Sequence, residues 1–132
     1  IRAIQRGSVD KRRGKPLNHI YFVIDIKKDI LEKRVKERID KMFNNGLLEE
    51  NISLLERGYT YEDKGMNSIG YIEFKEYFNE NISIEEVKEK IFNNTMSYIK
   101  RQITWFKRNT ESIWLDNEKD LYYKALNSIS KE

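Results

Sequence analysis

The chain has 132 residues; 39% are hydrophobic, 36% carry a charged side chain, and the formal net charge at neutral pH is +3. This length suits one domain with a buried core, and a charged fraction above the usual quarter indicates a heavily charged exterior. The absence of cysteine excludes disulfides, thiolate metal sites and cysteine nucleophiles, and it fits the cytoplasm, where we expect the protein. No apolar run is long enough for a membrane-spanning helix. We expect a monomer.

The first 18 residues form a basic lead-in. Six lysines and arginines stand in residues 1–15 against one acid, Asp10, and Pro16 is the only proline of the chain. Such a segment fits either a disordered basic arm or a surface that contacts phosphates, and the sequence leaves both open. Because the chain starts at Ile and not at Met, we expect it to be a piece of a longer protein.

Residues 19–26 predict a β-strand. The run is apolar, β-branched and aromatic without clean alternation, which is typical of strands buried on both faces of a parallel sheet. The only other strand candidate, residues 113–115, is short. We therefore infer that the sheet partners are missing and that the chain is the C-terminal part of a larger α/β protein. The only histidine, His19, makes neither a metal site nor a triad by itself.

Residues 28–45 predict a helix that ends at Gly46. At 100° per residue, Arg38 falls inside the apolar stripe of this helix, and Arg34 lies at its edge one turn earlier. A guanidinium there should be paired, because an unpaired buried charge is costly. Three interpretations stay open: a structural ion pair, a side chain that reaches outward to solvent, or an active-site arginine aimed at a pyrophosphate.

A second helix is expected over residues 47–57, followed by a polar loop over residues 59–68. Gly70 is expected to open a further helix that continues through residues 74–78. The amide groups at the start of that helix could bind an anion, and the alternative is an ordinary helix start with Tyr71 packed inside.

The sequence Ser83-Ile84-Glu85-Glu86 fits a capping box and predicts a long helix that runs to about Arg108. The helical projection gives this helix an apolar face and a roughly opposite cationic face. No acidic residue occurs in residues 93–109. Such a helix suits a partner with phosphates and bases, and the alternative is a solvated basic face over an ordinary core. A final amphipathic helix is expected over residues 118–130.

Known catalytic motifs are missing from the sequence. It has no P-loop, no dinucleotide-binding glycine pattern, no HExxH and no Ser-His-Asp set. The adjacent acids Glu49-Glu50 and Glu85-Glu86 stand near helix starts, where carboxylates favour the helix dipole. From the residues alone, the chain is a mostly helical, RNA-compatible fragment with one unusually placed arginine.

The order of several short motifs is more specific than any one of them. In chain order they are Arg38-Ile39-Asp40-Lys41-Met42, Gly46-Leu47-Leu48-Glu49-Glu50, Leu54-Leu55, Gly58-Tyr59, Ile69-Gly70-Tyr71, Tyr77, Asn94-Thr95, Lys100-Arg101-Gln102-Ile103-Thr104-Trp105-Phe106 and Trp114. This series resembles the C-terminal half of bacterial tRNA dimethylallyltransferases, also called tRNA isopentenyltransferases, over essentially the whole chain.

The resemblance implies a fold and a reaction. The fold is mainly α in this fragment with one or two short strands, as the C-terminal part of an α/β enzyme that resembles P-loop kinases. Residues 1–18 would form the exit of an insertion that grips the tRNA anticodon stem-loop, and residues 19–132 the core strand and helical part. The family transfers a dimethylallyl group from dimethylallyl diphosphate, assisted by magnesium, to the exocyclic amine of the adenosine 3′ of the anticodon. The P-loop and the aspartate base lie in the family's N-terminal half, so we expect this chain alone to be inactive.

The resemblance also assigns residues. Arg38 matches the family's catalytic arginine on the diphosphate side, Arg34 is expected to bind the same substrate, and no metal ligand is expected. The expected tRNA-binding residues are Arg2, Asn67, Ser68, Ile69, Gly70, Tyr71, Ile72, Lys100, Arg101, Gln102, Ile103, Thr104, Trp105, Phe106 and Lys107. Many members carry a basic residue where Ile72 stands here. Two alternative functions are a non-catalytic RNA-binding helical module and a helical protein-interaction domain.

Overall fold

The computed structural model describes residues 19–79, 81–116 and 121–129, and in these ranges the chain forms five helices and one pair of strands. The predicted fold class, mainly helical with one or two short strands, is confirmed. The basic lead-in, residues 1–18, lies outside the described residues, and so does the expected tRNA-binding residue Arg2. None of the helices in the described part is long and apolar enough to cross a membrane.

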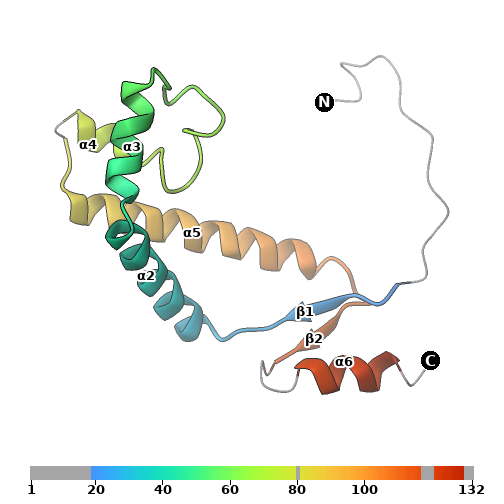
Figure 1. Ribbon diagram of the computed structural model, residues 1–132. Helices are drawn as coiled ribbons and strands as arrows, with labels where there is room; N and C mark the ends of the chain where they lie inside the picture. Colours follow the sequence, from blue (N-terminus) through green and yellow to red (C-terminus); the bar gives the residue numbers. More distant parts are fainter. Residues whose placement is uncertain (1–18, 80, 117–120, 130–132) are drawn as a thin grey trace, which may run out of the picture.

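The elements follow one another in an order that places nearly all helices between the two strands (Figure 1). They are β1 (Phe22–Ile24), α2 (Lys28–Asn44), α3 (Leu47–Glu56), α4 (Phe74–Phe78), α5 (Ile84–Phe106), β2 (Ile113–Leu115) and α6 (Leu121–Ile129). These bounds agree with the predicted helices to within a few residues at each end, except that α4 begins at Phe74 and not at Gly70.

The strands β1 and β2 pair in parallel, with Val23 opposite Trp114. The expectation that the first strand has no partner in this chain is therefore wrong, and the short strand predicted near Trp114 is confirmed. Parallel strands need a long crossover connection, and here the segment from α2 to α5 is that connection. Val23 and Leu115 are buried, whereas Ile24 is 52% exposed, so the strand is not buried on both faces within the described residues.

Local signals at the helix ends explain why the elements stop where they do. Gly46, with φ of 92°, separates α2 from α3 in a conformation that side chains with a Cβ rarely adopt. At the start of α5, the Ser83 hydroxyl accepts from the Glu86 amide and the Glu86 carboxylate accepts from the Ser83 amide, which confirms the capping box. These bonds lower the pKa of Glu86, so their stabilisation is present at neutral pH and is lost as the pH falls through that pKa.

The hydrophobic core lies where α2, α3, α4 and the N-terminal half of α5 meet. Its buried members are Val35, Ile39, Leu47, Phe74, Val87 and Ile91. Phe74 is fully buried, and its ring packs 5.7 Å from that of Phe43, between ring centroids. From this core α2 and α5 diverge toward the strand pair (Figure 1), so the space between the two helices widens with distance from the core.

Replacing Phe74 by alanine should lower the free energy of unfolding by about 3–5 kcal/mol, because the deletion leaves a cavity in the centre of the core. The measurement is urea unfolding of the 132-residue chain followed by far-UV circular dichroism. The control is Tyr122→Ala, since the Tyr122 side chain on α6 is 69% exposed. A decrease below about 1 kcal/mol for Phe74→Ala would contradict the position given to this core.

Candidate functional site

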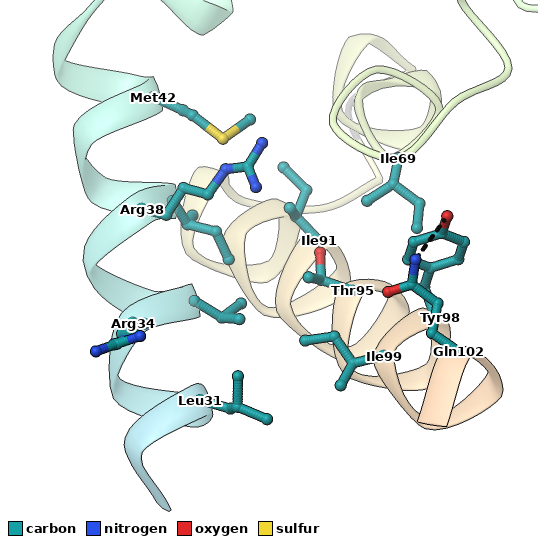
Figure 2. A pocket seen from close by; sticks show the side chains of 12 residues that line it. Leu31, Arg34, Arg38, Met42, Ile69, Ile91, Thr95, Tyr98, Ile99 and Gln102 are labelled. Carbon is teal, nitrogen blue, oxygen red and sulfur yellow. Dashed lines mark hydrogen bonds between the residues drawn. The ribbon is translucent and has the colours of Figure 1, made fainter. Parts of the chain in front are cut away.

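A pocket of about 530 Å³ lies between α2 and α5, on the side of the helices that faces the loop before α4 (Figure 2). The residues that line it from α2 are Leu31, Arg34, Val35, Arg38, Ile39 and Met42. Those from α5 are Ile91, Thr95, Tyr98, Ile99 and Gln102, and the loop adds Ile69. The lining residues recur every three or four positions on each helix, which is the spacing that aligns side chains on one helical face. The walls are mostly aliphatic, and the polar side chains among them are Arg34, Arg38, Thr95, Tyr98 and Gln102.

Arg38 stands at the mouth of this pocket and not inside the core. Its side chain is exposed, because the guanidinium extends from the apolar stripe of α2 across the opening toward α5 (Figure 2). Within the described residues it makes no hydrogen bond and no ion pair. Of the three interpretations left open by the sequence, the structural ion pair is not found among the described residues, and the side chain reaches outward over the pocket mouth.

Arg34 also lines the pocket, one helical turn from Arg38. Figure 2 shows its guanidinium pointing away from α5, whereas that of Arg38 points over the cavity. The two arginines therefore differ in how directly they can reach a molecule in the pocket. Arg38 is the cation that faces the cavity.

On the far side of the pocket, Tyr98 and Gln102 form a polar rim on α5. The Gln102 amide donates a hydrogen bond of 3.2 Å to the Tyr98 hydroxyl, and the Arg101 guanidinium lies 5.8 Å from the centroid of the Tyr98 ring. Tyr98 is 48% exposed, so its ring is open to a ligand. Aromatic, amide and guanidinium groups thus lie together beside the pocket mouth.

The remaining polar residues predicted to bind RNA on α5 face another direction. Lys100, Thr104 and Lys107 line a larger hollow of about 1090 Å³ on the other side of the helix, which Lys27 and Lys28 also line. The described structure therefore splits this predicted motif between two surfaces. A helix that turns by 100° per residue cannot present eight consecutive residues on one side.

Two residues of the same motif lie on its apolar face. Ile103 and Phe106 are half-buried and line a small cavity beside β1. Trp105 stays 56% exposed on the outside of the helix, and its ring meets that of Phe106 edge to face at 5.3 Å. The apolar and cationic faces expected for this helix are confirmed, and Trp105 is, like Tyr98, an exposed aromatic residue of α5.

The loop predicted to approach RNA has a turn at Gly70 and not a helix start. Gly70 has φ of 100°, and its amide donates a hydrogen bond of 2.9 Å to the Glu73 carboxylate. The helix begins only at Phe74. The expectation that amides at Gly70 open a helix and receive an anion is therefore wrong, because a carboxylate of the chain itself already accepts from the Gly70 amide.

The other residues of this loop are placed in different environments. Asn67 and Ser68 are exposed, Ile69 lines the pocket, and Ile72 is half-buried. The Tyr71 hydroxyl donates a hydrogen bond of 3.0 Å to Glu50 on α3. Burial raises the pKa of Tyr71, and the contact with Glu50 raises it further.

Two residues with a clear structural role at this site had no role assigned from the sequence. Glu73 is buried and also accepts a hydrogen bond of 2.7 Å from the Asn94 side chain on α5. The bond from Gly70 is local, because its acceptor stands three residues later in the chain. The bond from Asn94 joins residues 21 positions apart in the chain, and no local pattern reveals it.

Within the described ranges, no group of three or more histidine, aspartate or glutamate side chains lies close enough together to hold a metal ion.

The chain is similar to known proteins whose names describe the same activity. A sequence model described as IPP transferase matches residues 2–109. Proteins named tRNA dimethylallyltransferase are similar to the chain: 38% identical over 103 residues in Pelotomaculum thermopropionicum and 39% over 102 residues in Geobacter metallireducens. These alignments cover 78% and 77% of the chain but 33% of each relative. The chain thus spans about a third of the length of the curated relatives it matches.

Solved structures with a similar fold carry related names. A tRNA isopentenylpyrophosphate transferase from Staphylococcus epidermidis superposes with a TM-score of 0.71 at 32% identity, over 85% of this chain and 37% of that one. The full-length enzyme of that name from Bacillus halodurans superposes with a TM-score of 0.79 at 28% identity, over 98% of this chain and 44% of that one. Sequence and fold therefore lead to the same family.

Proposed function

Since the chain belongs to the IPP transferase family, we propose that the longer protein of which it is part, the parent protein, is a tRNA dimethylallyltransferase. In the proposed reaction the bond between the allylic carbon of dimethylallyl diphosphate and its diphosphate oxygen breaks. A new bond forms between that carbon and the exocyclic amine of the adenosine 3′ of the anticodon. The amine loses a proton, and pyrophosphate leaves.

The observation that carries this proposal is the guanidinium of Arg38 at the mouth of an apolar pocket. An allylic diphosphate has a short branched hydrocarbon and a doubly phosphorylated head, so it needs aliphatic walls beside a cation. Charge grows on the diphosphate as the carbon–oxygen bond breaks, and a guanidinium at the mouth stabilises that charge more in the transition state than before it. Because Arg38 has no partner among the described residues, its donors are available to the phosphates.

Arg34 is proposed as a second phosphate contact. It lies one turn from Arg38 on the same helix and lines the same pocket, so both cations can approach one diphosphate from α2. Its guanidinium points away from α5 in Figure 2, and a change of rotamer would bring it toward the mouth.

The family resemblance implies magnesium, and the described residues contain no group of three or more histidine, aspartate or glutamate side chains that could hold it. We therefore assign it to the remainder of the parent protein, together with the base that receives the amine proton. On this proposal the 132-residue chain alone transfers no dimethylallyl group.

The tRNA is proposed to bind across the exposed cationic and aromatic groups of α5 and the neighbouring loop. Trp105 and Tyr98 offer exposed rings on which bases stack, and Lys100 and Arg101 offer charges to phosphates. The loop residue Ile69 lies next to Tyr98 at the pocket rim (Figure 2). A base turned out of the anticodon loop would thus meet an aromatic rim close to the allylic carbon.

Replacing Arg38 by alanine in the parent protein should lower kcat for dimethylallyl transfer by about a hundredfold, because the charge on the leaving diphosphate is then without its cation. The dissociation constant for tRNA should stay within about twofold. Single-turnover transfer and filter binding give the two values. The kcat of Arg38→Lys should fall between those of Arg38→Ala and the unchanged protein, since lysine keeps the charge but lacks the bidentate fork.

The matched control is Lys33→Ala, which removes one cation from the exposed side of the same helix. It should leave transfer unchanged. Since Arg38 makes no ion pair among the described residues, Arg38→Ala should also leave the free energy of unfolding within about 0.5 kcal/mol of that of the unchanged protein. Wild-type kcat in Arg38→Ala would remove this residue from the reaction.

Replacing Lys100 and Arg101 together by alanine should weaken tRNA binding and flatten its dependence on salt. Removing one phosphate contact should lower the slope of log affinity against log salt by about 0.7–0.9, so the double variant should lower it by about 1.5. The measurement is the tRNA dissociation constant between about 50 and about 300 mM KCl. The control pair Lys33→Ala/Lys41→Ala removes the same charge from α2, and an equal slope change in both pairs would contradict a specific interface on α5.

A further inference from the structure

The buried carboxylate of Glu73 joins two walls of the pocket. One oxygen accepts the Gly70 amide at 2.9 Å, and the other accepts the Asn94 side-chain amide at 2.7 Å. Glu73 is 5% exposed, and among the described residues it has no cationic partner. A carboxylate buried with neutral donors only is costly unless both oxygens are well bonded.

Each of the two donors stands next to a residue that lines the pocket. Gly70 follows Ile69, the lining residue contributed by the loop, and Asn94 precedes Thr95 on α5. The Gly70 turn also lies against α2, because a Cβ at Gly70 would lie 3.5 Å from the terminal methyl of Met42. The carboxylate therefore links the loop residue beside Ile69 to the α5 residue beside Thr95.

We propose that Glu73 is a positioning residue whose carboxylate, through Gly70 and Asn94, sets the distance of the Ile69 wall from α5 and so the shape of the pocket for the allylic group. The proposal rests on the proposed function for the identity of the ligand. The two hydrogen bonds of Glu73, to Gly70 and Asn94, are present whatever the ligand is. Ile69 itself is 39% exposed and lines the pocket.

The proposed role depends on the two acceptor oxygens of Glu73 and not on its negative charge. Variants that remove the acceptors and variants that remove only the charge should therefore behave differently. Glu73→Met removes both acceptors at similar volume. Glu73→Gln keeps one acceptor for the Gly70 amide, and its new amide can donate to Asn94 after that side chain turns its amide over. Asn94→Ala removes only the link to α5, at an exposed helical position where alanine is favourable.

The experiment measures kcat and KM of the parent protein for dimethylallyl diphosphate and for the longer geranyl diphosphate. Glu73→Met should raise KM for dimethylallyl diphosphate about tenfold and should reduce the preference for it over geranyl diphosphate, because a loose wall no longer limits the pocket. Glu73→Gln should stay within about twofold of the unchanged protein. Asn94→Ala should raise KM about threefold, and the double variant Glu73→Met/Asn94→Ala should be no worse than Glu73→Met alone.

The control is Glu76→Gln on α4, a carboxylate that pairs with Lys90 at an exposed position. It should change neither KM nor the preference between the two diphosphates. A lower melting temperature for Glu73→Met with KM and preference unchanged in the folded protein would overturn the proposal, as would an equal defect in Glu73→Gln. If Glu73→Met does not fold, Asn94→Ala decides by the same criteria.

A second readout separates this proposal from the proposed function. Hydrogen exchange of the Gly70 amide in the 132-residue chain should be faster in Glu73→Met and unchanged in Glu73→Gln, whatever reaction the parent protein catalyses. Absence of transfer by the unchanged parent protein would overturn the proposed function alone. Exchange at Gly70 that is insensitive to Glu73→Met would overturn the bridge.

Discussion

The contact between α2 and α5 is the interaction on which the described structure depends. Val35 and Ile39 of α2 pack with Val87 and Ile91 of α5 in the core, and each fully buried aliphatic side chain of this kind contributes roughly 1.5–3 kcal/mol. Beyond this contact the two helices diverge toward the strand pair (Figure 1), and the pocket opens between them. The same two helices therefore provide both the core and the walls of the candidate site.

The geometry of α5 also explains why one helix serves several surfaces. Its N-terminal half is anchored in the core, and its C-terminal half presents a polar rim to the pocket, a half-buried apolar face to β1 and cations to the outside. The cationic side and the pocket rim therefore lie on different sides of the same helix. One helix thus carries both the rim of the candidate pocket and a cationic surface, so the distance between these two surfaces is set by the helix itself.

Local patterns allow much of this fold to be predicted from the sequence. The capping box at Ser83, the glycine at position 46 and the apolar periodicities of α2 and α5 all depend on residues a few positions apart, and each of these predictions is confirmed. The pairing of β1 with β2 cannot be derived in this way, because it joins residues about 90 positions apart through a helical crossover.

Only part of the candidate site can be predicted from the sequence, because it depends on side-chain directions and on contacts between residues far apart in the chain. Helical projection places Arg38 on the apolar stripe but says nothing of the direction of a long side chain, which here extends outward over the pocket. The Gly70 turn is closed by a bond from the Gly70 amide to Glu73, three residues later, whereas the bond from Asn94 to Glu73 requires the tertiary fold. The division of the α5 motif between two surfaces follows from helical geometry, once the positions of α2 and the strands are known.

The most direct test of this account is to assay dimethylallyl transfer to tRNA by the parent protein and by the 132-residue chain in parallel, with dimethylallyl diphosphate and magnesium. Mass spectrometry of the digested tRNA identifies the modified nucleoside. The account predicts a dimethylallylated adenosine next to the anticodon with the parent protein and none with the chain alone. Binding of tRNA without modification by the parent protein would contradict the account and would indicate a non-catalytic RNA-binding module.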